Sequence, residues 1–207
     1  MTMLLRHVQN PLTELRAYWE ALRDGGAPPM RAAVDPRGIA GALEHAFVVE
    51  RMAPGIARFR VAGMHLCDLM GMEVRGMPLS SLLEPEDRAV LSAGLEQVFS
   101  GPSVFEARLE SPRSMGRPAL EAQLLILPLR DWQGNPGVAM GGLVATGEIG
   151  RAPRRFTIAH RIVARVLVAQ PRVEDHPALA EAAATFTPAP MDRPARGRPH
   201  LRLVKSD

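Results

Sequence analysis

The feature that most constrains the fold is the period of the hydrophobic residues, which changes repeatedly between residues 44 and 150. Residues 47–51 (FVVER) are interpreted as one strand, and apolar and polar side chains alternate in residues 57–61, beyond a proline-glycine turn at residues 53–55. A period of two is typical of strands, so these two segments predict a β-hairpin. Residues 63–85 contain only short, glycine-interrupted helical segments, which are too brief to be stable unless they pack against the rest of the protein.

A longer helical period follows over residues 85–99, with acidic residues in its first turn and Gly101 placed to end it. Its apolar face consists of Leu91, Leu95, Val98 and Phe99. Alternation returns in residues 104–110 and, less cleanly, in residues 120–129, and together with residues 138–146 these segments predict three more strands. Two strands, short helices, one longer helix and three strands predict an α+β fold in which helices lie on one side of an antiparallel sheet.

A separate helix is predicted before this domain, over residues 11–23. Asn10 is a suitable N-cap and Pro11 suits the first helical position. The apolar face of this helix consists of Leu12, Leu15, Trp19 and Leu22. This face could cover the chain's own sheet or pair with a second copy, and we expect a homodimer interface because a tryptophan in an apolar seam is typical of interaction sites.

Charge and composition divide the chain at about residue 150. Residues 1–150 have a net charge of −3, whereas residues 151–207 have a net charge of +6 from ten arginines, one lysine and five acids. Six prolines follow residue 170, and such a composition buries too little apolar surface to fold alone. We therefore predict an N-terminal helical extension (1–43), a core domain (44–150) and a basic tail (151–207) that is largely disordered from about residue 170.

The sequence shows no sign of a disulfide, a signal peptide or a membrane span, and these three features bear on the cellular compartment. The single cysteine, Cys67, cannot form a disulfide within the chain, and the N-terminus lacks the apolar segment of a signal peptide. The most apolar run, residues 124–129, is far shorter than the roughly 18 residues that a membrane helix needs. We expect a cytoplasmic protein without a membrane span.

Several short motifs between residues 18 and 88 resemble those of a known domain family. Residues 69–79 (LMGMEVRGMPL), followed by the tetrapeptide Pro85-Glu-Asp-Arg, look like the PAS pattern in which two glycines flank a short helix and Pro-x-Asp-Arg leads into the long helix. Residues 18–19 (YW), 35–37 (DPR) and 58–63 (RFRVAG) resemble a family of stand-alone bacterial PAS proteins known chiefly from alphaproteobacteria. The resemblance covers roughly residues 10–150.

This resemblance implies a five-stranded antiparallel sheet whose concave face and helices enclose a small apolar cavity, used for a ligand or simply as core. It also implies that the sheet and its flanking helices carry protein contacts. The candidate lining residues are Phe59, Met64, Cys67, Met70, Leu91, Leu95, Phe105 and Leu124. The methionines at positions 64, 70, 72 and 77 either line an adaptable ligand cavity or fill irregular space between short helices.

Cofactor and catalytic motifs are weak. Cys67 departs from the reactive cysteine motif of flavin-binding PAS domains, and we interpret it as a structural thiol. Haem would need a histidine such as His45 or His65, because the predicted helix 85–99 has none. No zinc spacing or nucleophile motif is present, and Gly141-Gly142 indicates close backbone approach within a strand. We expect no catalytic residue, no metal and no cofactor.

The resulting prediction is a non-enzymatic sensory or regulatory protein that binds a signalling partner and is tuned by a small apolar ligand if one is bound. One alternative is a nucleic-acid-associated protein that uses the arginine-rich tail. We prefer a solvated or partner-binding segment for the tail, because only Phe156 is available among its first arginines for base stacking. A haem-binding PAS sensor is the other alternative.

Overall fold

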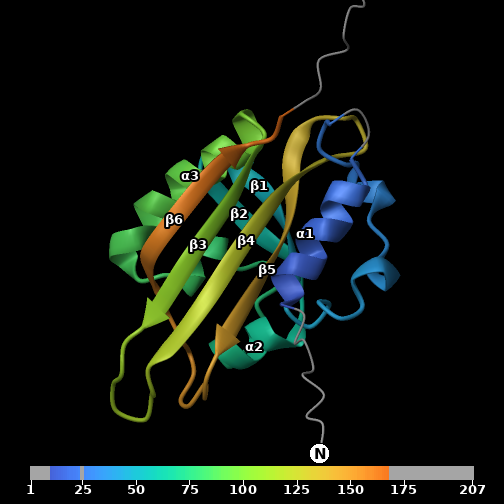
Figure 1. Cartoon of the computed structure of the whole chain (residues 1–207). Coiled ribbons are helices and arrows are strands. Elements are labelled where there is room, and N and C mark those ends of the chain that lie inside the picture. The colour runs from blue at the N-terminus through green and yellow to red at the C-terminus, as the bar shows by residue number, and fades with distance from the viewer. Residues whose placement is uncertain (1–9, 24–25, 168–207) are drawn as a thin grey trace, which may run out of the picture. The chain divides into compact units, whose positions relative to one another are not determined.

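The computed structural model describes residues 10–23 and 26–167, which form one six-stranded antiparallel sheet with helices on both faces (Figure 1). The strands are β1 (Ala46–Ala53), β2 (Ile56–Ala62), β3 (Ser103–Ser111), β4 (Leu120–Arg130), β5 (Pro136–Thr146) and β6 (Thr157–Arg165). The helices are α1 (Pro11–Ala21), α2 (Met64–Met70) and α3 (Arg88–Ser100), with 3-10 turns η1 (Arg31–Ala33), η2 (Pro36–Ile39), η3 (Leu79–Leu82) and η4 (Pro85–Asp87). The order across the sheet is β2-β1-β5-β4-β3-β6. Within the described residues, no helix is long and apolar enough to cross a membrane.

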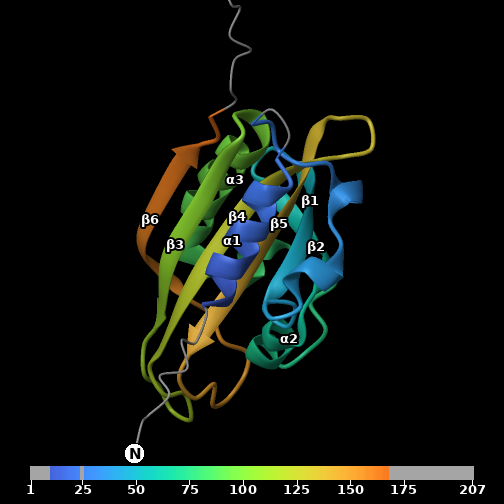
Figure 2. The ribbon, with the colours of Figure 1, turned by 45° about the vertical axis from the view of Figure 1, so that its right-hand side comes forward.

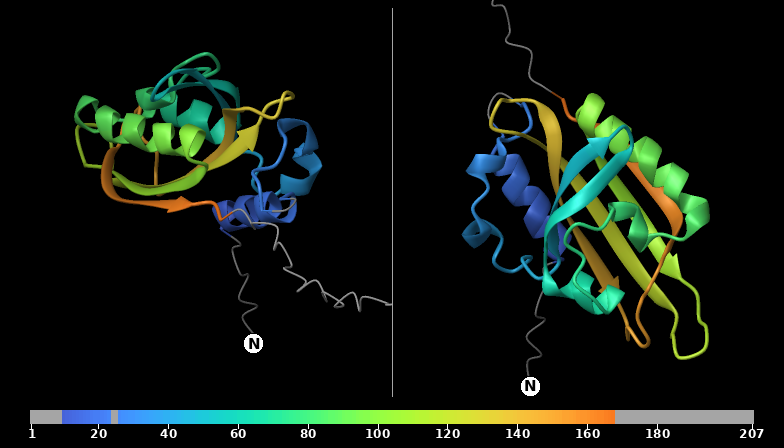
Figure 3. Two further views of the ribbon diagram at one scale, coloured as in Figure 1. Left: turned by 90° about the horizontal axis from the view of Figure 1, so that it is seen from above. Right: turned by 180° about the vertical axis from the view of Figure 1, so that it is seen from behind.

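The two faces of the curved sheet have different covers. Helices α2 and α3 lie on the concave, inner face, whereas α1 lies across the outer face (Figures 2 and 3). The core is accordingly divided into two hydrophobic clusters. Strand β4 contributes Leu124 and Ile126 to the inner cluster and Leu125 and Leu127 to the outer one. Its apolar run is therefore continuous instead of alternating, as expected for a strand that is buried on both faces.

Helix α1 forms where the capping residues predict it. The Asn10 side chain accepts a hydrogen bond from the Leu12 amide at 3.0 Å, and Pro11 occupies the first turn. Leu15 and Trp19 are fully buried, and the Trp19 indole Nε1 donates to the Pro128 carbonyl of β4 at 2.8 Å. Apolar burial and this hydrogen bond fix a helix that would be marginal in isolation.

Helix α3 is also confirmed, and it begins after the turn η4. Its buried residues are Leu91, Gly94, Leu95, Val98 and Phe99. The Asp87 side chain does not cap the helix; its Oδ2 accepts a hydrogen bond from the Ile158 amide of β6 at 2.8 Å. Asp87 thus joins the start of α3 to an edge strand.

The expectation of five strands is wrong by one. Strand β6 pairs antiparallel with β3 and forms an edge of the sheet, within the segment assigned to the basic tail. Most of its residues are exposed, so it lacks the alternation that identifies a half-buried strand. The predicted disorder from about residue 170 falls outside the described residues.

Candidate functional site

The residues predicted to line an inner cavity are mostly brought together. Phe59, Met70, Leu91, Leu95, Phe105 and Leu124 belong to the inner hydrophobic cluster. Cys67 is half-buried in α2 and packs against the same cluster, and its structural role stays a prediction. Met64 is an exception, because it is 68% exposed. The helical period places Met64 opposite Leu66 and Met70, so its side chain lies on the solvent face of α2.

The four methionines therefore do not form one group. Met70 is buried and Met77 packs partly buried against the inner cluster, whereas Met64 and Met72 are exposed. A single methionine-lined cavity is wrong for this structure. Met70 and Met77 contribute ordinary packing between the short helices and the sheet.

Aromatic rings occupy much of the space over the concave face. The rings of Phe47 and Phe59 meet edge to face, with centroids 5.5 Å apart. A Cβ at Gly94 of α3 would lie 2.4 Å from the Phe105 ring, so this glycine lets the helix approach β3 closely. The inner face is therefore an apolar core, and it offers few hydrogen-bonding groups to a polar ligand.

His45 and His65, the candidate haem ligands, lie together where β1 and α2 begin. Their ring centroids are 4.5 Å apart, and His65 Nε2 accepts a hydrogen bond from the Ala145 amide of β5 at 3.1 Å. Burial, and then the neighbouring His45, lower the pKa of His65. A neutral His65 that accepts a backbone hydrogen bond has a structural role, because it connects α2 to the sheet.

The apolar face of α1 is buried within the chain. Leu12, Leu15 and Trp19 pack with residues of β4 and β5, and Leu22 is half-buried at the end of the helix. Of the two alternatives for this helix, the structure shows it on its own sheet, so these residues are not available as the predicted interface. The homodimer itself stays a prediction.

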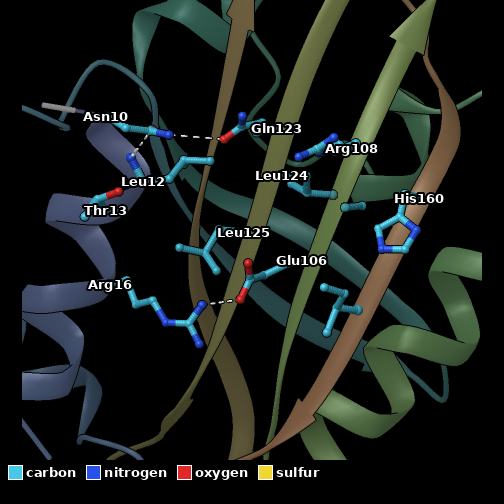
Figure 4. A pocket seen from close by; sticks show the side chains of 12 residues that line it. Asn10, Leu12, Thr13, Arg16, Glu106, Arg108, Gln123, Leu124, Leu125 and His160 are labelled. Carbon is cyan, nitrogen blue, oxygen red and sulfur yellow. Dashed lines mark hydrogen bonds and ion pairs between the residues drawn. The ribbon is translucent and has the colours of Figure 1, made fainter. Parts of the chain in front are cut away.

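Beside α1, the outer face carries an open groove of about 690 Å³ that runs toward β6 (Figure 4). It is lined by Asn10, Leu12, Thr13, Arg16, Glu106, Ala107, Arg108, Gln123, Leu124, Leu125, His160 and Ile162. Its floor is formed by β4, β3 and the edge strand β6, and α1 forms one side. Ile162 is 54% exposed, although it is a large aliphatic residue.

Two polar contacts hold α1 against the floor of the groove. Arg16 forms an ion pair with Glu106 of β3, and the Asn10 amide donates to Gln123 Oε1 of β4 at 3.1 Å. Both partners of the ion pair are about 40% exposed, so the pair contributes at most about 1 kcal/mol to stability. Arg108 has no carboxylate within ion-pair distance in the described part of the chain.

Sequence reasoning missed this groove. Glu106 and Arg108 occupy the polar positions of an alternating strand, which are normally solvated, and His160 and Ile162 lie in the strand that was not predicted. Register brings them together, because Arg108 pairs with His160 and with Gln123, while Glu106 pairs with Ile162. No local sequence pattern marks these residues as a site, because register alone brings them together.

Comparisons with known proteins place the fold in a family. A family model described as PAS domain matches residues 7–144, about two thirds of the chain. No curated protein matches. The solved structures that resemble the chain include a light-oxygen-voltage domain studied with a flavin analogue, at 20% identity and a TM-score of 0.41, covering 54% of this chain and 84% of that one.

Two further structures are more distant. An RNA-binding light-oxygen-voltage receptor is 17% identical with a TM-score of 0.39, and covers 57% of this chain and 35% of that one. A sensory box histidine kinase/response regulator from Burkholderia thailandensis is 16% identical with a TM-score of 0.35, covering 54% and 85% of the two chains. At these scores the structures add no argument about function. Because the family model matches more than half of the chain, the chain belongs to the PAS domain family.

Proposed function

We propose that this protein is a non-enzymatic PAS regulator that binds a signalling protein in the groove between α1 and β6. The observation that carries the proposal is the open groove on the outer face of the sheet, with an exposed Ile162 between charged side chains. The concave face, by contrast, carries the inner hydrophobic cluster, against which α2 and α3 pack. We place this regulator in the cytoplasm, where a separate protein produces the output.

The chemistry of the groove suits protein recognition. Ile162 supplies exposed apolar surface, and Arg108, Gln123 and His160 supply hydrogen-bonding groups around it. An apolar centre with a polar rim is the usual composition of a protein interface. A partner that covered Ile162 would remove its apolar surface from water, which is favourable.

The inner cluster and helix α1 contact opposite faces of strand β5. This proximity supports the proposal that a small apolar ligand in the inner cluster tunes partner binding in the groove. A Cβ at Gly141 of β5 would lie 2.5 Å from the Phe47 ring on the inner face, and one at Gly142 would lie 2.7 Å from the Leu12 side chain of α1. Only the backbone of β5 separates these two contacts. An apolar ligand that displaced Phe47 would therefore change the position of α1 on the sheet, and α1 forms one side of the groove.

Affinity capture from the source cells tests the proposal. The bait is the full chain as wild type, as Ile162→Asp in the groove, and as Ile56→Asp, a matched control because Ile56 is 50% exposed at the far edge of the sheet. We expect a protein that is retained by wild type and Ile56→Asp and lost from Ile162→Asp. Recovery of the same proteins by all three baits would contradict the proposal.

A further inference from the structure

A second polar site lies away from the groove, where the β3–β4 and β5–β6 loops run side by side at one end of the sheet (Figures 1 and 3). The Arg151 amide donates to the Gly116 carbonyl at 2.8 Å, and Arg117 Nε donates to the Arg151 carbonyl at 3.1 Å. The two loops carry five arginines, at positions 113, 117, 151, 154 and 155. Within the described residues, none of these five forms an ion pair.

Arg154 is the most unusual of the five, because it is fully buried. Its guanidinium donates to the carbonyls of Ile149 at 2.6 Å and Pro118 at 2.7 Å, and its Nε donates to Ser111 Oγ at 3.3 Å. All of these acceptors are neutral. Burial, and then the neighbouring Arg117, lower the pKa of Arg154. An arginine nevertheless keeps its proton in proteins, so a positive charge without a counter-ion lies beneath the two loops.

A pocket of about 300 Å³ opens beside this charge. Its polar lining consists of Ser111, Ser114, Arg117, Arg155 and Glu84, and two prolines complete it. Ser111 belongs to both the pocket and the Arg154 network: its hydroxyl oxygen accepts from Arg154, which leaves the hydroxyl hydrogen free to be donated to a ligand. The buried charge is in this way connected to the pocket by one hydroxyl.

We propose that this pocket binds a small oxyanion, of the size and charge of a phosphate monoester. Arg117 and Arg155 supply planar donors that match phosphate oxygens, and the Ser111 hydroxyl supplies a third donor polarised by Arg154. The volume suits a phosphate group with a short organic part, because it lies at the lower end of small-molecule sites. Glu84 is the one carboxylate in the lining, and it opposes the ligand. The site is independent of the groove on the outer face.

Calorimetric titration of the full chain with inorganic phosphate tests this inference. We expect saturable binding that Arg117→Gln and Arg155→Gln each weaken by about tenfold or more, since each removes a charge-assisted donor. Glu84→Gln should bind more tightly, because it removes the opposing charge. The control Arg75→Gln changes an exposed arginine outside the pocket and should leave the affinity unchanged.

The outcomes separate the pocket from general attraction to a basic chain. Absence of saturable binding to the wild type would overturn the inference, as would equal weakening by Arg75→Gln and Arg117→Gln. Thermal unfolding of each variant shows whether it is folded. If a pocket variant fails to fold, phosphate-induced shifts of the Ser111 and Ser114 amide resonances in the wild-type protein decide the question, since a pocket site requires them and their absence contradicts it.

Discussion

At the scale of single residues, the glycine pair of β5 shows how the sheet is packed from both sides. A Cβ at Gly141 would lie 2.3 Å from the Leu125 carbonyl oxygen, a backbone atom that cannot move aside. Gly137 lies in the same strand, and a Cβ there would meet nothing within 4 Å. Both glycines lie in β5, but only Gly141 is packed closely against neighbouring atoms.

Alanine substitutions at these positions make the first prediction. Gly141→Ala should lower the free energy of unfolding by about 1–3 kcal/mol or more, because it overpacks the core. Gly137→Ala should change it by less than about 0.5 kcal/mol. Chemical denaturation measures both, and equal effects at the two positions would show that the close approach of β4 and β5 is wrong.

His65 makes a second prediction at this scale, on pH. Its pKa in the folded chain lies below the ordinary 6.5, because of burial and His45, against the opposing effects of Glu44 and Asp68. Below about pH 6.5 the unfolded chain therefore binds more protons than the folded one, and stability falls as the pH decreases. This contribution to stability is fully present above pH 6.5.

Denaturation of His65→Gln at pH 7.5 and 5.5 checks the effect. The glutamine side-chain oxygen can still accept from the Ala145 amide, but it does not titrate. The variant should lose less stability than wild type between the two pH values. An unchanged pH dependence in the variant would assign the effect to other groups.

At the scale of elements, α1 illustrates what the sequence can and cannot predict. Asn10 and Pro11 define its start, and Leu15 and Trp19 define its apolar face, so the helix itself was predictable. The same face suits a second copy or the chain's own sheet, and only the three-dimensional arrangement of β4 and β5 decides between them. β6 escaped prediction for the converse reason, since an exposed edge strand needs no hydrophobic alternation.

The candidate site follows the same rule. The inner cluster was largely predictable, because burial leaves a hydrophobic period in α3 and β3. The groove was not, because Arg108, Gln123 and His160 come together through strand register, which leaves no trace in local composition. Residues that are polar and exposed have the same appearance in a solvated face and in a binding site.

The two tryptophans give the prediction that belongs to α1. Trp19 is fully buried and donates its indole hydrogen to the Pro128 carbonyl, whereas Trp132 is 81% exposed in the β4–β5 loop. Trp19→Ala should cost about 3–5 kcal/mol of unfolding free energy, and Trp132→Ala less than about 0.5 kcal/mol. Thermal and chemical denaturation measure both, and a small effect at Trp19 would mean that α1 is not docked as described.

At the scale of the whole described domain, helices pack on both faces of one sheet, and the outer face is covered only in part. Helices α2 and α3 cover the inner face, and α1 covers β4 and β5 on the outer face but leaves β3 and β6 open (Figure 2). The open part coincides with the groove and with the exposed Ile162. The surface that this PAS domain offers to a partner therefore lies on the outer face, over β3 and β6. It lies next to α1, whose position depends on its contacts with the sheet.

Site-specific photocrosslinking in the source cells tests the central claim most directly. A photoreactive benzoylphenylalanine replaces Ile162 in the groove or, as the control, Ile56 at the opposite edge of the sheet. The account predicts a covalent adduct with a specific partner protein from position 162 and none of the same mass from position 56. The same adducts from both positions, or no adduct from position 162, would contradict it.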